Sequence, residues 1–191
     1  MFLAVHASVG AIAGNAVASP TVAFALGFLS HFFMDMIPHG DERMYHGYKS
    51  GTKVKRAILY VAGDAILTVI LISVFFLRQD FFSPVAVSMG IIGGLLPDFI
   101  VGLFEIMKPG RRERKRLYTW MYGRIESFHT LHMKNHCLFG AFLSRGHAHE
   151  HTLQDDLKGF GKLMDGSRDV PFKYGLMIQG ATLVGLVTII L

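Results

Sequence analysis

The sequence predicts an all-α protein, a polytopic membrane helical bundle of about five transmembrane helices with a cytoplasmic, His-rich helical segment. Three observations lead to this prediction. The chain has 191 residues, of which 51% are hydrophobic, and its mean hydropathy is +0.40. Only 17% of its residues are charged, whereas a typical soluble domain has about 25%. The apolar residues are also grouped in long runs separated by polar stretches, which is the pattern of membrane spans.

Five apolar segments are candidate spans, and in chain order they cover residues 2–18, 21–37, 57–77, 84–107 and 174–191. The first two are close to the lower limit of about 17 residues for a span. The turn between them, Ser19-Pro20, is tight, so we expect an antiparallel helical hairpin. Pro38 ends the second segment, and Pro97 lies inside the fourth. No basic residue precedes the small-residue stretch at 16–18, so we expect the first segment to be retained rather than cleaved as a signal peptide.

These segments divide the chain into three parts. We expect a four-helix membrane core with a buried His/Asp site, then a cytoplasmic basic and His-rich segment, and finally a C-terminal transmembrane helix. In the sequence these parts correspond to residues 1–107, 108–170 and 171–191.

The distribution of Lys and Arg predicts the orientation of the chain. Eighteen of the 19 lie in two stretches, 39–56 and 108–173, and Arg78 alone lies between the third and fourth spans. Cytoplasmic loops of membrane proteins are rich in Lys and Arg. We therefore expect a multi-pass protein of the cell (inner) membrane, with the N-terminus in the cytoplasm and the C-terminus outside. The net charge of +5 then indicates membrane lipids as partners rather than nucleic acid.

Glycines predict close contact between helices. The chain contains 21 of them, and small residues allow membrane helices to approach each other closely. Gly10 and Gly14 form one small-xxx-small pair in the first span. Gly90 and Gly94 form another in the fourth.

Ionisable residues inside the predicted spans are the strongest indication of a functional site. An Asp at the centre of a span costs about 2.5–3.5 kcal/mol on insertion scales, so such residues are rare without a purpose. Four spans, or the residues just beyond them, contain one or more: His6, His31, Asp35, His39, Asp64, Asp98 and Glu105. With the N-terminus inside, all of them lie in the cytoplasmic half; Asp98, for example, is about 21 Å from the outer end of its helix. This common depth predicts one site near the cytoplasmic leaflet.

The spacing of these residues indicates a metal site. His31, Asp35 and His39 are four residues apart, a spacing that drifts only about 40° per step around a helix. Imidazole and carboxylate are ligands for Zn, the divalent metal we expect, with Mn or Fe as alternatives. Cys137 is the only cysteine, which excludes an intrachain disulfide and a cysteine-cluster zinc site. The expected ligands are His6, His31, Asp35, His39, Asp98 and His136; the alternative is a buried hydrogen-bonded network without metal.

A second group of histidines follows in the polar segment. His129, His132 and His136 lie on one face of a helix that we expect over 118–143, because they are three and four residues apart. This helix is on the cytoplasmic side, so it could cover the site. We therefore expect Asp64, His132 and His129 to be the catalytic residues. The alternative is an exposed stripe that faces solvent or lipid headgroups.

Several motifs are similar to those of one family. Residues 27–38, with His31 and Asp35, resemble the HxxxD motif of the bacterial membrane-bound metal-dependent hydrolases. Gly94-Leu-Leu-Pro-Asp98 resembles the LLPD motif of that family, His6 resembles its early histidine, and residues 129–132 stand where it has a His-rich motif. Here HxxxD precedes LLPD, which differs from the family's order. The resemblance covers roughly 1–40 and 90–136, and it implies a distant or rearranged inner-membrane hydrolase.

Three functions are compatible with these observations. The first is a metal-dependent hydrolase of a lipid or lipid-linked phosphoester at the cytoplasmic leaflet. The second is an ion or metal transporter that uses the same buried groups, and the third is a non-catalytic membrane scaffold. A hydrolase needs a pocket open on one side, whereas a transporter needs access from both sides. The outer halves of the predicted spans carry no polar residues that would provide such access.

Overall fold

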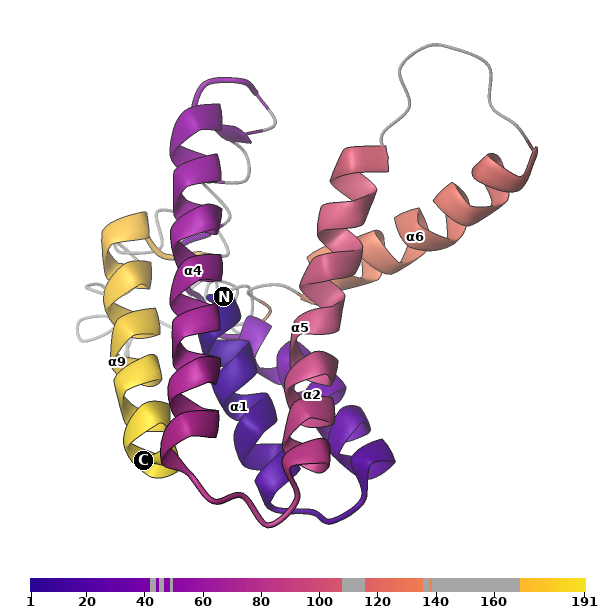
Figure 1. Ribbon diagram of the computed structural model, residues 1–191. Coiled ribbons are helices and arrows are strands. Elements are labelled where there is room, and N and C mark those ends of the chain that lie inside the picture. The colour runs from indigo at the N-terminus through magenta and orange to yellow at the C-terminus, as the bar shows by residue number, and fades with distance from the viewer. Residues whose placement is uncertain (42–43, 45–46, 49, 108–115, 136–137, 139–168) are drawn as a thin grey trace, which may run out of the picture.

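The computed structural model describes residues 1–41, 44, 47–48, 50–107, 116–135, 138 and 169–191, and within these residues it is all-helical (Figure 1). The expected all-α class is therefore confirmed. Most of the 108–170 segment, including His136, lies outside the described residues. The main helices are α1 (Leu3–Asn15), α2 (Pro20–Asp35), α4 (Val54–Arg78), α5 (Pro84–Met107), α6 (Arg116–Asn135) and α9 (Phe172–Ile190).

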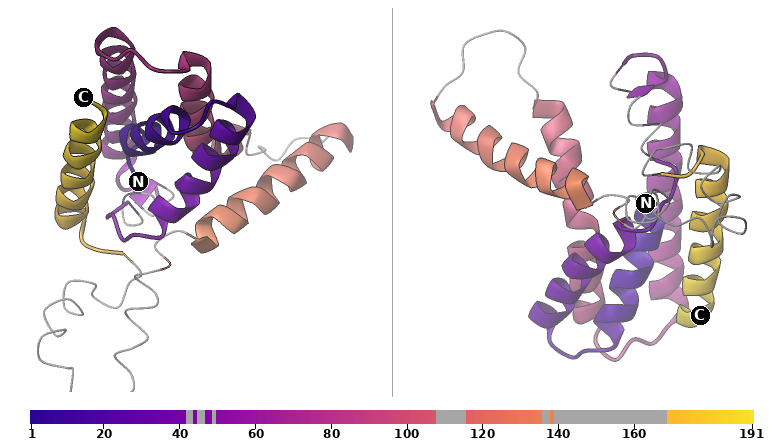
Figure 2. Two further views of the ribbon diagram at one scale, coloured as in Figure 1. Left: turned by 90° about the horizontal axis from the view of Figure 1, so that it is seen from below. Right: turned by 180° about the vertical axis from the view of Figure 1, so that it is seen from behind.

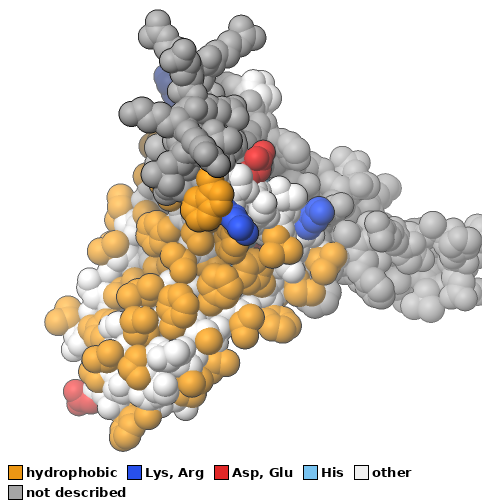
Figure 3. Space-filling model, turned by 90° about the vertical axis from the view of Figure 1, so that its right-hand side faces the viewer, with side chains coloured by type: hydrophobic (Ala, Val, Ile, Leu, Met, Phe, Trp, Pro, Cys, Tyr) orange, Lys and Arg blue, Asp and Glu red, His pale blue; other side chains and the backbone are white. Residues whose placement is uncertain are grey.

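Three helices are long and apolar enough to cross a membrane: Val54–Arg78, Pro84–Leu103 and Phe172–Ile190. Their apolar side chains are exposed; Leu59 and Leu77 of α4, for instance, are 72% and 82% exposed. Figure 3 shows hydrophobic side chains over much of one face, with charged side chains at the margins. Such a surface indicates membrane association. The hairpin helices α1 and α2 are shorter, with 13 and 16 residues, or about 20 and 24 Å. The described residues therefore contain three candidate spans where the sequence predicted five.

Local sequence explains the hairpin that carries the first two helices. Ser19 precedes α2, and its side chain accepts a hydrogen bond from the Val22 amide. Pro20 is the first residue of the helix, where its missing N–H has no cost. Helix α2 ends at Asp35, shortly before Pro38, which cannot continue it. The chain therefore turns sharply after α1 and returns along it.

Helix α1 lies at the centre of the bundle, in contact with α2, α4, α5 and α9 (Figure 2). Glycines allow its backbone to touch α5. A Cβ atom on Gly10 would overlap the Gly90 carbonyl, and a Cβ on Gly27 of α2 would overlap the same carbonyl. A Cβ on Gly94 would crowd the His6 carbonyl. This close packing places the ionisable residues of α1, α2 and α5 side by side.

Below these residues, toward the Asn15 end of α1, the interior is filled by apolar side chains. A buried cluster from α1, α4 and α5 consists of Ala7, Ala11, Phe75, Val87 and Ile91. Val187 and Ile190 of α9 pack against it. The polar interior is thus confined to one end of the central helix.

Helix α6 packs against α2 through a hydrogen bond and aromatic rings. The Asn135 side-chain amide donates to the Phe32 carbonyl at 2.7 Å. The ring of Phe128 lies 6.1 Å from that of Phe32, centre to centre. The helix was expected over 118–143, and the structure describes it from Arg116 to Asn135. Its docking brings His132 to the end of α2.

Candidate metal centre

The Asp35 carboxylate is the centre of a buried cluster contributed by three helices. Its Oδ1 lies 3.2 Å from His6 Nε2. Its Oδ2 lies 3.0 Å from His31 Nε2 and 3.4 Å from His132 Nε2. All four side chains are buried. The sequence placed three of them at one depth in the membrane, and the fold brings in the fourth from α6.

Asp98 of α5 lies beside this carboxylate. Its oxygens are 3.9 Å from His31 Nε2 and 4.0 Å from His6 Nε2. Two overlapping groups could therefore hold a metal ion: His6, His31 and Asp98, and His31, Asp35 and His132. The Asp98 side chain is 26% exposed, whereas that of Asp35 is 1% exposed. The cluster thus opens toward its surroundings at Asp98.

The distances within the cluster are those of atoms arranged around one ion. Two ligand atoms that each bind Zn at about 2.1 Å with tetrahedral geometry lie about 3.4 Å apart. The observed separations between nitrogen and oxygen run from 3.0 to 4.0 Å. Each of the two groups of three side chains is therefore compact enough to be a candidate site for a cation.

The orientation of His31 is set by a backbone carbonyl. Its Nδ1 lies 2.8 Å from the Gly94 oxygen. A carbonyl can only accept, so Nδ1 must carry a hydrogen, and in the neutral ring Nε2 then presents a lone pair. This lone pair points at the Asp35 carboxylate, which is also an acceptor. Only a proton or a metal ion between the two atoms makes the contact favourable.

Other atoms in the cluster lack hydrogen bonds in the same way. Within the described residues, five buried atoms of His6, His31, Asp35 and Asp98 have no hydrogen-bond partner of acceptable geometry: His6 Nδ1, His6 Nε2, His31 Nε2, Asp35 Oδ2 and Asp98 Oδ2. Each buried polar atom left unsatisfied costs about 1–3 kcal/mol. A cation held by His6, His31 and Asp98, or by His31, Asp35 and His132, would satisfy part of this set, so the donor types fit a metal ion.

A second set of polar atoms lies on the other side of Asp35. The Met1 amine is 3.0 Å from Asp35 Oδ1, 2.7 Å from His39 Nε2 and 3.3 Å from Asp41 Oδ2. Burial opposes charge on this amine, but the carboxylates of Asp35, Asp41 and Asp98 outweigh it and raise its pKa to about 11. The amine is therefore a cation at neutral pH. His39, expected as a ligand of the single site, belongs to this second set.

Two of the imidazoles lie outside the spans, and both are held neutral. Burial lowers the pKa of His132 to about 4, despite the nearby Asp35 carboxylate. Burial and the Met1 ammonium likewise lower the pKa of His39. Metal ligands must be deprotonated, so both rings are in the form that binds a metal.

The remaining predicted residues are placed differently. The Asp64 oxygens accept hydrogen bonds from the Leu3 and Ala4 amides, at 2.6 and 3.3 Å, so this carboxylate caps the start of α1. His129 lies one helical turn before His132 on α6 and is half-buried. His136 is outside the described residues. Of the expected catalytic residues, His132 is the one with a nitrogen within 3.4 Å of the central carboxylate.

The chain matches no family model, no curated protein and no solved structure. The resemblance to the membrane-bound hydrolases therefore remains an expectation based on short motifs. The indication of function therefore comes from the geometry of the His/Asp cluster.

Four polar residues around the site were not predicted from the sequence. Asp169 accepts from the His39 and Gly40 amides. Gln179 donates to the His39 carbonyl, and both Gln179 and Tyr60 bond to Asp41. A glutamine carries no charge, so hydropathy and the positions of Asp, Glu and His in the spans do not mark Gln179 in the last apolar segment.

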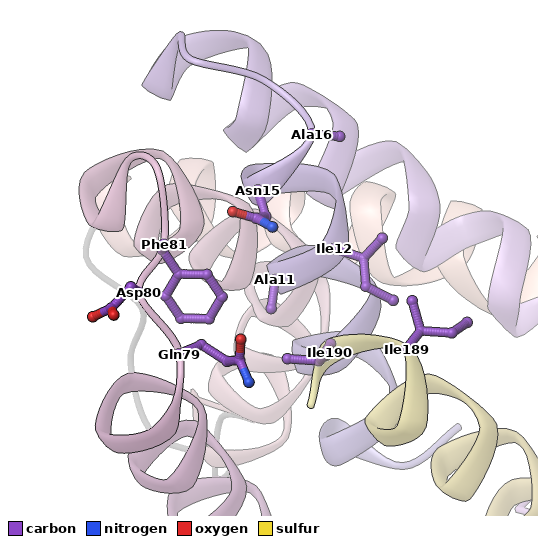
Figure 4. A pocket seen from close by; sticks show the side chains of 9 residues that line it. All are labelled: Ala11, Ile12, Asn15, Ala16, Gln79, Asp80, Phe81, Ile189 and Ile190. Atoms are coloured by element: carbon purple, nitrogen blue, oxygen red, sulfur yellow. The ribbon is translucent and has the colours of Figure 1, made fainter.

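A shallow cavity of about 250 Å³ lies at the opposite end of α1 (Figure 4). It is lined by residues from the end of α1, the α4–α5 loop and the end of α9, namely Ala11, Ile12, Asn15, Ala16, Gln79, Asp80, Phe81, Ile189 and Ile190. The apolar cluster around Ala7, Phe75 and Val87 lies between this cavity and the His/Asp cluster. The cavity is therefore not part of the candidate metal centre.

Proposed function

We propose that the protein is an integral membrane metal-dependent hydrolase of a lipid or lipid-linked phosphoester, with its site toward the cytoplasmic leaflet. The observation that carries this proposal is the buried set of acceptor atoms around Asp35, which face one another without hydrogen-bond geometry. His6, His31, Asp35 and Asp98 would hold the ion, and His132 would complete its coordination from α6. A bound divalent cation of this kind polarises a phosphoryl oxygen and lowers the pKa of water.

The position of the cluster supports a lipid-derived substrate. Asp64, which touches the start of α1, is the eleventh residue of α4, about 15 Å from the first residue of that helix. The first turn of α4 and the residue before it carry three basic side chains, Lys53, Lys55 and Arg56. In the proposed orientation they would face the cytoplasmic headgroups and attract an anionic phosphate. A phosphoester attached to a lipid could reach Asp98, the least buried member of the cluster, without crossing the hydrocarbon.

The packing disfavours the alternative of a transporter. An ion in transit needs a polar route through the bundle. Between the cluster and the opposite end of α1, the interior is instead occupied by Ala7, Ala11, Phe75, Val87 and Ile91. One-sided access is what a hydrolase requires. We accordingly propose that α1 and α2 complete the membrane core as a short hairpin alongside the three longer helices.

The test compares metal content and phosphate release in the wild type and in two ligand variants. Asp35→Ala and Asp98→Ala should each lose bound metal and activity while the protein remains inserted in the membrane. Removing a ligand weakens coordination more than it weakens helix packing. Asp80→Ala is the matched control, because Asp80 is an exposed carboxylate at the far end of α4.

Two results would contradict the proposal. Metal-free wild-type protein that releases no phosphate from a panel of lipid phosphoesters would favour the scaffold. Bound metal without hydrolysis, together with ion flux in proteoliposomes, would favour the transporter.

A further inference from the structure

Helix α6 lies at the end of the bundle where α1 begins and α2 ends, away from the α1–α2 turn and the C-terminus (Figure 1). It contacts α5 and α2 and runs outward from them. In the proposed orientation this end meets the cytoplasmic headgroups, because the two basic stretches of the sequence adjoin it. One side of α6 is therefore against protein, and its other sides can meet lipid headgroups or water.

Contacts with α2 fix the rotation of α6 about its own axis. The Asn135 amide donates to the Phe32 carbonyl at 2.7 Å, and this carbonyl belongs to the last turn of α2, where it has no partner within the helix. The Phe128 ring packs against that of Phe32, and His132 Nε2 lies 3.4 Å from Asp35 Oδ2. The side of α6 that carries Phe128, His132 and Asn135 is thus held against the bundle.

This rotation exposes a stripe along α6. Its members are Trp120, Arg124, Ser127, Leu131 and Lys134, all of them exposed. They are alternately four and three residues apart, so they fall within an arc of about 80° around the helix. The two apolar members, Trp120 and Leu131, are 62% and 60% exposed. The residues that contact α2 lie about a quarter of a turn away.

The side chains of the stripe are those of helices that lie on a membrane surface. Trp120 and Leu131 are apolar, Arg124 and Lys134 are cations, and the Arg124 guanidinium lies 5.7 Å from the centre of the Trp120 ring. Tryptophan is enriched at the boundary between hydrocarbon and water. Arg and Lys beside it keep their charged ends among the headgroups. The exposed carboxylate Glu126 lies about a third of a turn from the stripe, on the side away from α2, so the stripe itself is positive.

We propose that α6 lies in the plane of the membrane surface and binds anionic lipid headgroups through this stripe. Interfacial helices of this kind combine buried apolar side chains with attraction between basic side chains and anionic lipids. A zwitterionic surface would accommodate Trp120 and Leu131 but would offer no net charge to Arg124 and Lys134. The inference goes beyond the proposed function, because it needs neither a metal ion nor a substrate. The same helix holds His132 against Asp35, so the lipid surface and the His/Asp cluster meet on one element.

The test uses the full chain reconstituted in vesicles of phosphatidylcholine alone or of phosphatidylcholine mixed with phosphatidylglycerol. Trp120 is the only tryptophan, so all tryptophan fluorescence reports on α6. Lipids with brominated acyl chains should quench this fluorescence more strongly in the vesicles that contain phosphatidylglycerol. Bromine near the headgroup should quench more than bromine near the chain end. Acrylamide, added to the water, should quench less when phosphatidylglycerol is present.

A charge reversal tests the part played by the cations. Lys134→Glu lies about 21 Å along the helix from Trp120, so it changes the charge of the stripe without touching the fluorophore. It should lower the difference in quenching between the two kinds of vesicle about two-fold or more. Arg78→Glu is the matched control, because Arg78 is an exposed basic residue at the last position of α4, at the other end of the bundle. It should behave like the wild type.

Two kinds of result would contradict the inference. If Trp120 is open to acrylamide and is not quenched by brominated lipid in either kind of vesicle, the stripe faces water and the proposal is overturned. Equal quenching in the two kinds of vesicle, or a Lys134→Glu variant that behaves like Arg78→Glu, would overturn the assignment to anionic headgroups. Metal content and phosphate release do not enter these readings, so failure of the proposed function would be seen separately.

Discussion

At the scale of single residues, similar carboxylates perform different tasks in this protein. Asp35 and Asp98 face imidazole nitrogens, whereas Asp64 faces backbone amides. All three lie in apolar segments, so their cost to the membrane-embedded chain is comparable. The three carboxylates differ in the groups that they contact. Leu3 and Ala4 begin α1, where helix amides have no carbonyl partner within their own helix.

Asp64→Ala should therefore destabilise the fold without removing metal. The loss of a helix-capping acceptor costs about 1–2 kcal/mol, which should appear as a lower midpoint of thermal unfolding in detergent. Metal content measured on the same samples should stay at the wild-type level. Asp80→Ala is the control for loss of a carboxylate. A variant that unfolds like the wild type but has lost its metal would return Asp64 to the catalytic role expected from the sequence.

At the scale of helices, glycine rather than apolar volume determines the packing. In lipid, the hydrophobic effect does not drive helices together, so close backbone contact and van der Waals packing must do so. Gly90 is the common contact, because the backbones of both α1 and α2 lie against it. The two small-xxx-small pairs noticed in the sequence, at 10/14 and 90/94, lie in this contact. The ligand geometry depends on it, since His6 and His31 reach Asp98 only if the three helices are this close.

Gly90→Ala should separate α1 from α5. The added methyl would overlap the Gly10 carbonyl, and overpacking of this kind costs about 1–3 kcal/mol. Gly102→Ala is the matched control on the same helix, because a Cβ there meets no atom within 4 Å. By helix propensity alone, that control should be neutral or stabilised by up to about 1 kcal/mol. The measurement is the free energy of unfolding in micelles, and equal stability of the two variants would contradict the packing described.

At the scale of the whole molecule, two connections between helices and the C-terminus share one end of the bundle. The α1–α2 turn, the α4–α5 loop and the C-terminus lie at the same end of the bundle in Figure 1. In the sequence, Arg78 is the one Lys or Arg of the 19 that belongs to the segments joining the spans at this end, which predicts that the end faces away from the cytoplasm. A reporter fused after Leu191 should therefore read as external, and so should one inserted between Gln79 and Pro84. A cytoplasmic reading at Leu191 would reverse the proposed orientation.

Much of this architecture could be predicted because it depends on composition and periodicity. The apolar runs located the five hydrophobic helices to within a few residues, and the depth of His6, Asp35 and Asp98 indicated that they meet. Hydropathy could not show how far α1 and α2 penetrate a membrane. Spacing could not reveal that Asp64 caps α1, because that contact joins residues about 60 positions apart.

The loop at residues 39–41 shows where prediction from the sequence stops. Asp41 follows a proline and a glycine in what reads as an ordinary polar connection. The conformation of this loop depends on hydrogen bonds from His39 to Asp169 and from Gln179 to Asp41, and both partners are more than 120 residues away in the sequence. The one signal in the sequence is Gln179, which interrupts the last apolar segment. Polar but uncharged side chains in spans need partners too.

The short hairpin has a consequence for the mechanics of the bilayer. Lipid that touches α2, whose Val22, Leu29 and Phe33 are exposed, meets about 24 Å of helix, whereas a typical hydrocarbon core is about 30 Å thick. If α1 and α2 complete the membrane core as proposed, the bilayer would have to thin on their side, while α4, with 25 residues, demands no thinning. The resulting uneven deformation would be smallest in thin membranes. Hydrophobic mismatch would then set the preferred surroundings of the protein as well as headgroup chemistry, and a thick, stiff bilayer would oppose its insertion.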